Sequence, residues 1–209
     1  MTEPDLILLH GAGQSSDAWR GVIAGLPEHV TPHALEYGSG STFTLSTAAA
    51  RVLNYLDTRR LEHVVLCGLS LGGIVAALVA AKRPEQVTAL LLSGIQVRPN
   101  RFLMHLQNTV IRALPTHAVE RAGGRPKREL LHILDVAAGT DLAPVLPSIS
   151  APALVLCGTK DRPNLPAAHQ AAELLPNSRL ELIPGVGHAW NTSHPALFAE
   201  RITRFVYPG

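Results

Sequence analysis

The stretch that decides the fold is Val64-Val65-Leu66-Cys67-Gly68-Leu69-Ser70-Leu71-Gly72-Gly73, which continues into the alanine-rich run of residues 74–81. The apolar, β-branched residues before the turn predict a buried strand, and the alanine-rich run after it predicts a helix. Glycine at positions 68 and 72 removes side chains that would collide where the strand and the helix approach each other. The pattern therefore predicts a sharp strand–turn–helix unit that leaves the Ser70 hydroxyl exposed beyond the strand end.

A serine in the pattern Gly-x-Ser-x-Gly, between a strand and a helix, is typical of a nucleophile elbow. The backbone of Ser70 lies at a helix N-terminus, whose free N–H groups can stabilise a developing anion. The alternative is an ordinary Gly/Ser turn, so the remainder of the chain has to decide between the two interpretations.

The chain on both sides of this unit alternates short apolar runs with helical patterns. Strands are expected at 6–9, 87–93, 153–157 and 180–183, and a weaker strand at 29–37, interrupted by Pro32, is expected near an edge. Helices are expected from a Ser15 or Ser16 cap to about 26, and at about 45–58, 167–175 and 195–206. This alternation predicts an α/β fold with a mostly parallel sheet of about six strands and helices on both faces.

Length and composition indicate one core-rich domain, residues 1–209, because 46% of the residues are hydrophobic and only 16% are charged. A formal net charge of +2 is too small to imply nucleic acid as a partner. The sequence has no stretch long enough for a membrane span. The histidines are scattered without metal-ligand spacing, so no metal site is predicted.

The cysteines and the N-terminus favour a cytoplasmic location. Cys67 and Cys157 each precede a glycine at the end of an apolar run, so we expect both thiols to be buried and reduced. A disulfide between them is not expected, because a third strand should separate their strands. The first five residues carry acids and no basic region, unlike a secretory signal.

Residues 95–150 differ from the rest, because their pattern is helical throughout. We interpret them as a helical excursion that covers the sheet edge and forms a short cap. Basic residues outnumber acids in it: Arg98, Arg101, Arg112, Arg121, Arg125, Lys127 and Arg128. These charges either steer an acidic substrate or form a solvated helical surface, and the second interpretation is favoured. Phe102 is a candidate for the substrate pocket, although packing against the sheet is the alternative.

Three chemically suitable residues follow predicted strands: Ser70, Asp161 and His188. In parallel α/β sheets, sites form at the carboxyl ends of the strands. The chain order Ser…Asp…His is the order found in α/β-hydrolases. Asp135 and Asp141 are weaker candidates for the acid, because they lie in the helical excursion. The alternatives for Asp161 and His188 are a helix-capping acid and a structural turn histidine.

The chain resembles the α/β-hydrolase superfamily over nearly its whole length. The resemblance rests on Leu8-Leu9-His10-Gly11-Ala12-Gly13, the elbow 68–73, Leu156-Cys157-Gly158-Thr159-Lys160-Asp161 and Gly185-Val186-Gly187-His188-Ala189. Members usually carry a β-hairpin before the His-Gly loop. Here that loop begins at residue ten, so we expect a small hydrolase that lacks the hairpin.

The resemblance implies a role for each residue. Ser70 is the nucleophile, His188 its general base and Asp161 the acid that orients His188. The backbone N–H groups of Leu71 and Ala12 form the oxyanion hole. This chemistry requires neither a metal nor an organic cofactor.

The leading hypothesis is a serine hydrolase that acts on a small-molecule acyl substrate: an ester, a thioester or a lactone. The same triad also serves carbon–carbon bond hydrolases, lyases and perhydrolases, and a non-catalytic binding protein is a more remote alternative. Gln14 and Trp190 are further candidates for the substrate pocket. A phosphate-binding interpretation of the loop at 10–16 is rejected, because the loop lacks the Gly-Lys-Ser/Thr ending and the Gly-x-Gly-x-x-Gly spacing.

Overall fold

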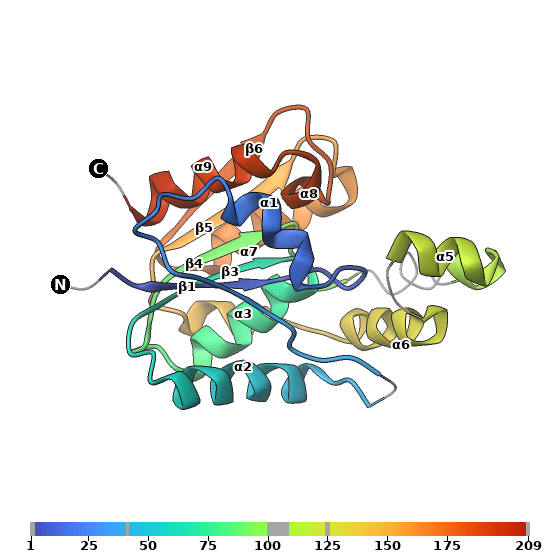
Figure 1. Ribbon diagram of the computed structural model, residues 1–209, viewed down its shortest axis with the longest axis horizontal. Helices are drawn as coiled ribbons and strands as arrows, with labels where there is room; N and C mark the ends of the chain where they lie inside the picture. Colours follow the sequence, from blue (N-terminus) through green and yellow to red (C-terminus); the bar gives the residue numbers. More distant parts are fainter. Residues whose placement is uncertain (1–2, 41, 100–108, 124–125, 208–209) are drawn as a thin grey trace.

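Strand β3 (Val64–Leu69) is an inner strand of a six-stranded sheet in a computed structural model that describes residues 3–40, 42–99, 109–123 and 126–207 (Figure 1). The strand order is β2-β1-β3-β4-β5-β6, and every pair of neighbours is parallel. The other strands are β1 (Asp5–Leu9), β2 (Pro32–Leu35), β4 (Val87–Ser93), β5 (Ala153–Gly158) and β6 (Ser178–Ile183). The predicted parallel sheet is therefore confirmed.

The inner strands are buried on both faces, as expected for a parallel sheet covered by helices. Successive side chains of a strand point to opposite faces, so each strand contributes to two cores. In β1, Ile7 and Leu9 belong to the larger core, whereas Leu6 and Leu8 belong to the smaller one. This double burial fixes the positions of the strand ends, and therefore of the residues that follow them.

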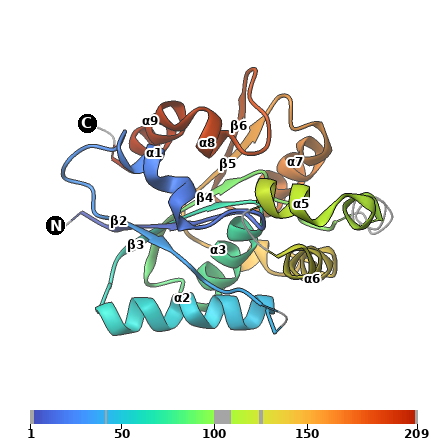
Figure 2. The ribbon, with the colours of Figure 1, turned by 45° about the vertical axis from the view of Figure 1, so that its right-hand side comes forward.

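Helices cover both faces of the sheet (Figures 1 and 2). The larger core is covered by α2 (Leu45–Arg59), α3 (Leu71–Lys82) and α7 (Leu165–Leu174). The other face carries α1 (Arg20–Ile23), α8 (Trp190–Ser193) and α9 (Pro195–Val206). Trp19 and Phe198 meet edge to face there, with ring centroids 5.2 Å apart.

The segment 95–150 is helical in its described part, which contains no strand. It includes helical residues 109–113, α5 (Thr116–Gly123), α6 (Lys127–Ala138) and the 3₁₀ turn η2 (Leu146–Ser148). Figure 1 shows α5 and α6 beyond the carboxyl ends of the strands rather than beside an edge strand. Buried Ile133 anchors α6 to the larger core. Phe102 and Arg101 lie outside the described residues.

The structure departs from the predicted helix at 16–26. It has a 3₁₀ turn, η1 (Ser16–Trp19), followed by the single turn of α1. Ser15 occupies the N-cap position, but its side chain makes no capping hydrogen bond. Gly21 and Gly25 weaken the helix, and Pro27 follows directly. The strand predicted at 29–37 is shorter, β2, and it is an edge strand as expected.

The two cysteines are free and buried. β4 lies between their strands β3 and β5, as predicted. Burial raises the pKa of both thiols, that of Cys157 to about 12, which keeps them protonated and unreactive. Among the residues that the structure describes, no helix has the length and apolarity needed to cross a membrane.

Candidate active site

The turn after β3 has the strained geometry that its glycines allow. Ser70 has φ 54° and ψ −115°, an unfavourable region for a residue with a side chain. The Ser70 N–H donates to the carbonyl of Ser93 at 2.8 Å, which ties the turn to the end of β4. A Cβ atom on Gly72 would lie 2.1 Å from the carbonyl oxygen of Leu9, so this position admits only glycine. The predicted close approach at the elbow is confirmed.

The strain at Ser70 predicts that Ser70→Gly is more stable than Ser70→Ala. Glycine tolerates this backbone conformation and alanine does not, so relief of strain should raise the free energy of unfolding of Ser70→Gly by about 1–3 kcal/mol relative to Ser70→Ala. The greater freedom of glycine in the unfolded chain reduces this advantage by about 0.5–1 kcal/mol. Urea unfolding of the two variants measures the difference. Equal stabilities would contradict strain at this residue.

Asp161 and His188 form a hydrogen-bonded pair at the ends of the neighbouring strands β5 and β6. His188 Nδ1 lies 2.7 Å from Asp161 Oδ2. The carboxylate is 6% exposed, whereas the His188 side chain is 41% exposed. Because an ionised carboxylate only accepts hydrogen bonds, His188 Nδ1 carries a proton. The Nε2 atom of a neutral His188 is then the basic nitrogen.

Gly94, directly after β4, makes room for this pair, a requirement that sequence reasoning missed. Gly94 has φ +57°, and a Cβ atom on it would lie 2.9 Å from both Cε1 and Nδ1 of His188. The same atom would be 3.3 Å from Asp161 Oδ2. β4 lies between β3 and β5. The residue directly after β4 must therefore lack a side chain for Asp161 and His188 to lie on the same side of the sheet end as Ser70.

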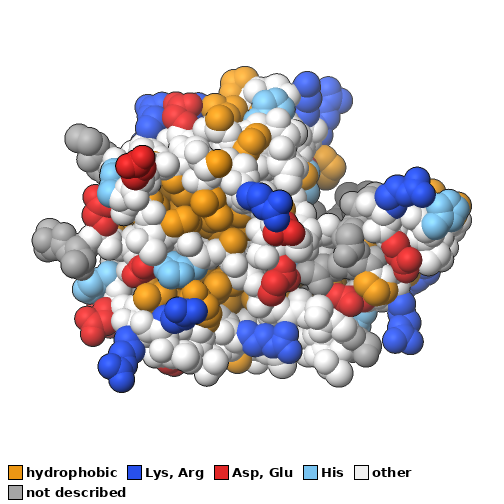
Figure 3. Space-filling view, in the orientation of Figure 1, with side chains coloured by type: hydrophobic (Ala, Val, Ile, Leu, Met, Phe, Trp, Pro, Cys, Tyr) orange, Lys and Arg blue, Asp and Glu red, His pale blue; other side chains and the backbone are white. Residues whose placement is uncertain are grey.

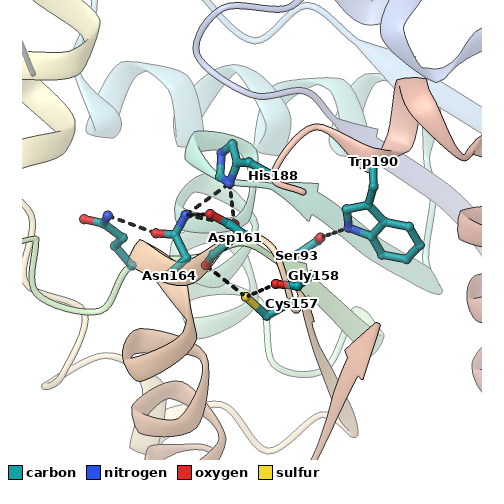
Figure 4. A network of polar contacts seen from close by, with 8 residues as sticks. Ser93, Cys157, Gly158, Asp161, Asn164, His188 and Trp190 are labelled. Carbon is teal, nitrogen blue, oxygen red and sulfur yellow. Dashed lines mark hydrogen bonds and ion pairs between the residues drawn. The ribbon is translucent and has the colours of Figure 1, made fainter. Parts of the chain in front are cut away.

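One side-chain amide contacts Asp161 and a second amide contacts the first, and sequence reasoning missed both. Asn164 Nδ2 lies 2.9 Å from each carboxylate oxygen of Asp161 and 3.1 Å from His188 Nδ1. Figure 4 shows the Asn164 amide directed at these two side chains. Gln96 Nε2 in turn donates to Asn164 Oδ1 at 2.9 Å. Amides have no sequence motif for this role, so only the three-dimensional arrangement reveals them.

One cavity of about 670 Å³ is bordered by most of the predicted site residues. Its wall includes the predicted triad, both predicted oxyanion residues and Gln14: Ser70, Asp161, His188, Ala12, Leu71 and Gln14. Apolar side chains of α3, α6 and residue 111 form a further part of the wall: Ile74, Leu130, Leu134, Ala137 and Ile111. Gln96, Asn164 and Thr192 add polar groups to it. The predicted pocket residue Phe102 is outside the described part of the chain.

Trp190 lies apart from this wall, contrary to its predicted place in the pocket. It is 1% exposed, and its indole N–H donates to Ser93 Oγ at 2.9 Å. Its ring packs against Phe198, with centroids 4.2 Å apart. Trp190 begins α8, and its large apolar ring is buried beneath α9, where it contributes to the smaller core.

The loop after β1 is held in a tight turn that orients its backbone. The Gln14 N–H donates to the Gly11 carbonyl at 3.1 Å, and the Gly11 N–H donates to Gln14 Oε1 at 3.2 Å. The Gln14 amide also exchanges hydrogen bonds with buried Asn191, at 3.1 and 3.2 Å. Ala12 is the second residue of this turn, a position whose N–H takes no part in the turn's own hydrogen bond.

The buried side chain of His10 contacts the same loop. Its Nδ1 lies 2.9 Å from the Gly11 carbonyl oxygen, and its Nε2 lies 3.1 Å from Glu36 Oε2. Its ring stacks on Tyr37, with centroids 4.6 Å apart. Burial raises the pKa of Glu36, but the Ser16 N–H and the charge of His10 outweigh burial and hold this pKa below its ordinary value.

The lowered pKa of Glu36 predicts a pH-dependent cost for Glu36→Gln. The charged form contributes stability above the ordinary value of 4.5, and this contribution is lost as the pH falls through the folded-state pKa. We expect the free energy of unfolding to drop by about 1 kcal/mol or less at neutral pH, because Glu36 is half exposed and solvent screens it. Urea unfolding near pH 7 and near pH 3 measures this. A cost that is the same at both pH values would contradict it.

Two of the described basic residues of the helical segment form ion pairs on its surface. Arg98 pairs with Asp141 at 3.0 and 3.1 Å, and Arg112 with Asp135 at 3.4 Å. The hydrogen bond from Arg98 lowers the pKa of Asp141, with help from the Ala143 N–H. Figure 3 shows basic side chains on this protruding segment with acidic ones among them. Among the described residues the cavity wall contains no Lys or Arg, which favours the solvated-surface interpretation.

Comparison with known proteins identifies the class of protein. The fold is an all-parallel α/β sheet with helices on both faces, and residues 6–201 match the model of the alpha/beta hydrolase family. The chain therefore belongs to the alpha/beta hydrolase family.

Relatives and solved structures agree with this assignment. A pimeloyl-[acyl-carrier protein] methyl ester esterase from Pectobacterium carotovorum is 27% identical over 243 residues, which cover 96% of this chain and 93% of the relative. The crystal structure of an enol-lactonase from Burkholderia xenovorans has a TM-score of 0.83 at 19% identity and covers 98% of this chain and 92% of its own. A hydrolase from Pseudomonas aeruginosa also gives a TM-score of 0.83, at 20% identity, covering 98% and 90%. The chain is similar to named hydrolases along almost its whole length, and the protein is an enzyme of this family.

Proposed function

We propose that the protein cleaves a small ester, thioester or lactone through an acyl-enzyme formed on Ser70. The observation that carries the proposal is that the strained Ser70 turn and the hydrogen-bonded Asp161–His188 pair open onto one cavity. A serine hydroxyl is almost fully protonated at neutral pH and needs a base within reach. A histidine oriented by a buried carboxylate is such a base.

The reaction then follows in two steps. Ser70 Oγ attacks the substrate carbonyl carbon while His188 Nε2 takes the hydroxyl proton. Two backbone N–H groups donate hydrogen bonds to the negatively charged carbonyl oxygen and stabilise it. They belong to Ala12 and to Leu71, the first residue of α3. His188 gives its proton to the leaving alcohol or thiol, and water, activated by the same histidine, releases the acid and restores Ser70.

The apolar part of the cavity wall indicates the polarity of the acyl or alcohol group of the substrate. α6 places Leu130 and Leu134 on the cavity opposite Ile74 of α3. Neutral, apolar groups fit this wall better than charged ones, because a charge would lose its water without gaining a partner there. In this proposal residues 1–209 form one domain, and residues 95–150 act as the cap that closes the apolar side of the site. The methyl ester named for the Pectobacterium relative is a neutral ester of this kind.

Covalent labelling tests the proposal directly. The intact mass of the folded protein is measured after treatment with a fluorophosphonate probe, which phosphonylates activated serines with loss of fluoride. We expect one adduct on the wild type and none on His188→Ala, since the base is then missing. Turnover is then compared across a panel of neutral esters, thioesters and lactones. A folded wild type that gains no adduct and cleaves no member of the panel would overturn the proposal, and a carbon–carbon bond reaction or ligand binding would then be examined.

A further inference from the structure

Asn164 and Gln96 form a chain of amides that ends on the carboxylate of Asp161. Asn164 is the last residue of the 3₁₀ turn η3 (Arg162–Asn164), and its backbone N–H donates to the Asp161 carbonyl at 3.0 Å. This short connection places its side chain beside that of Asp161. Asn164 is 7% exposed and Asp161 is 6% exposed, so water has little access to either group.

Gln96 is held from a different element. It follows β4 and lies between Ile95 and Val97, both of which are completely buried. These two anchors fix the backbone on either side of Gln96, and its Nε2 reaches Asn164 Oδ1 at 2.9 Å. The contact therefore links the end of β4 to the turn after β5.

The chain of amides has a defined polarity. An ionised carboxylate only accepts hydrogen bonds, so it requires the NH₂ end of Asn164 on its side. That orientation turns Asn164 Oδ1 the other way, where the NH₂ end of Gln96 meets it. The two contacts demand the same orientation of Asn164, and each supports the other.

The consequence for Asp161 concerns both of its oxygens. His188 Nδ1 lies 2.7 Å from Asp161 Oδ2, and Asn164 Nδ2 lies 2.9 Å from both Oδ1 and Oδ2 of Asp161. A buried carboxylate oxygen without a donor would favour rotation of the carboxyl group toward another partner. With the donor in place, the carboxylate keeps one oxygen directed at His188.

We propose that Asn164 and Gln96 are positioning residues that hold the carboxylate of Asp161 oriented toward His188. Both residues also border the cavity, and the role inferred here is exercised through Asp161. The inference rests on the proposed function for its effect on rate, but its structural part concerns the Asp161–His188 pair alone.

The test compares isosteric variants that replace a hydrogen-bond donor by an acceptor with variants that remove the polar group. Asn164→Asp is isosteric but directs a carboxylate oxygen at Asp161, and we expect the rate of fluorophosphonate labelling and kcat for an ester to fall about 100-fold. Asn164→Ala removes the donor without adding a charge and should cost about 10-fold. Gln96→Glu turns the Asn164 amide around and should cost about 10-fold, whereas Gln96→Leu leaves Asn164 free to keep its orientation and should cost about 3-fold or less.

The order of these effects separates the proposal from a merely structural role. If the amides only fill space, the isosteric variants Asn164→Asp and Gln96→Glu would be the most active of their pairs, and that result would overturn the proposal. Thermal unfolding checks each variant. Gln96 is only partly buried, so its two variants provide the same comparison should Asn164→Asp fail to fold.

A second measurement does not depend on turnover. A proton held between an imidazole and a carboxylate gives a far-downfield resonance in the proton NMR spectrum, which His188→Ala assigns. We expect this resonance in the wild type and in Gln96→Leu, and its loss in Asn164→Asp and Gln96→Glu. An unchanged resonance in all variants would overturn the proposal. A wild type that shows the resonance but neither labels nor turns over would overturn the proposed function instead.

Discussion

Replacing Ser70 with alanine is expected to lower kcat for a neutral ester by a factor on the order of 10⁴ to 10⁶. Without the hydroxyl no acyl-enzyme forms, and the remaining site can only assist a direct attack by water. The Ser70 side chain makes no capping hydrogen bond to α3, so its loss leaves the turn intact. KM should change little, because the cavity wall that binds the acyl group is unaltered. Steady-state kinetics with an aryl ester measures both quantities.

A matched serine variant controls for this result. Ser148 is exposed in η2, on the segment that follows α6, and it does not border the cavity. Ser148→Ala should keep full turnover and gain the same fluorophosphonate adduct as the wild type. If Ser70→Ala retained more than a tenth of the wild-type kcat, Ser70 would not be the nucleophile.

Gly94→Ala is expected to lower kcat about 100-fold while the protein remains folded. The added methyl group would lie 2.9 Å from the His188 ring, so the imidazole or the backbone after β4 has to move. A displacement of about 1 Å at a catalytic group costs about 100-fold in rate. The positive φ adds about 1–2 kcal/mol of destabilisation. Kinetics and urea unfolding on the same preparation separate the loss of rate from the loss of stability.

Gly40→Ala provides the control for backbone strain. Gly40 has φ +86°, and a Cβ atom on it would meet nothing within 4 Å. This variant therefore carries a comparable backbone penalty without a contact at His188, and it should keep nearly full kcat. Equal losses of kcat in Gly94→Ala and Gly40→Ala would show that the clash with His188 has no part in the effect.

The elements with strong local signals were predicted closely. The strand at 87–93 and the helix at 195–206 have the predicted limits, because an apolar run and an amphipathic pattern decide each of them locally. The residues of the candidate triad could be proposed from the sequence for a related reason. Each follows a strand in a short stretch with glycines, and parallel strands place all such stretches at one edge of the sheet.

The residues that were missed or misplaced depend on contacts between distant segments. Nothing near Gly94 in the sequence indicates that His188 will pack against it, since 93 residues lie between them. Asn164 and Gln96 look like ordinary polar residues until β4 and β5 bring them together. Trp190 follows the candidate base closely, yet its side chain turns into the core, because a ring of that size gains more from burial under α9.

The position of β6 at the edge of the sheet links the site to partial unfolding. β6 has a neighbour on one side only, and most of its side chains are incompletely buried, whereas β3 is buried throughout. Edge elements with little buried surface open at lower free energy than the centre of a fold. His188 follows this edge strand, whereas Ser70 follows an inner strand. We therefore expect His188 to lose its position on warming before Ser70 does, so that the proposed activity is lost at a lower temperature than the one at which the central sheet unfolds.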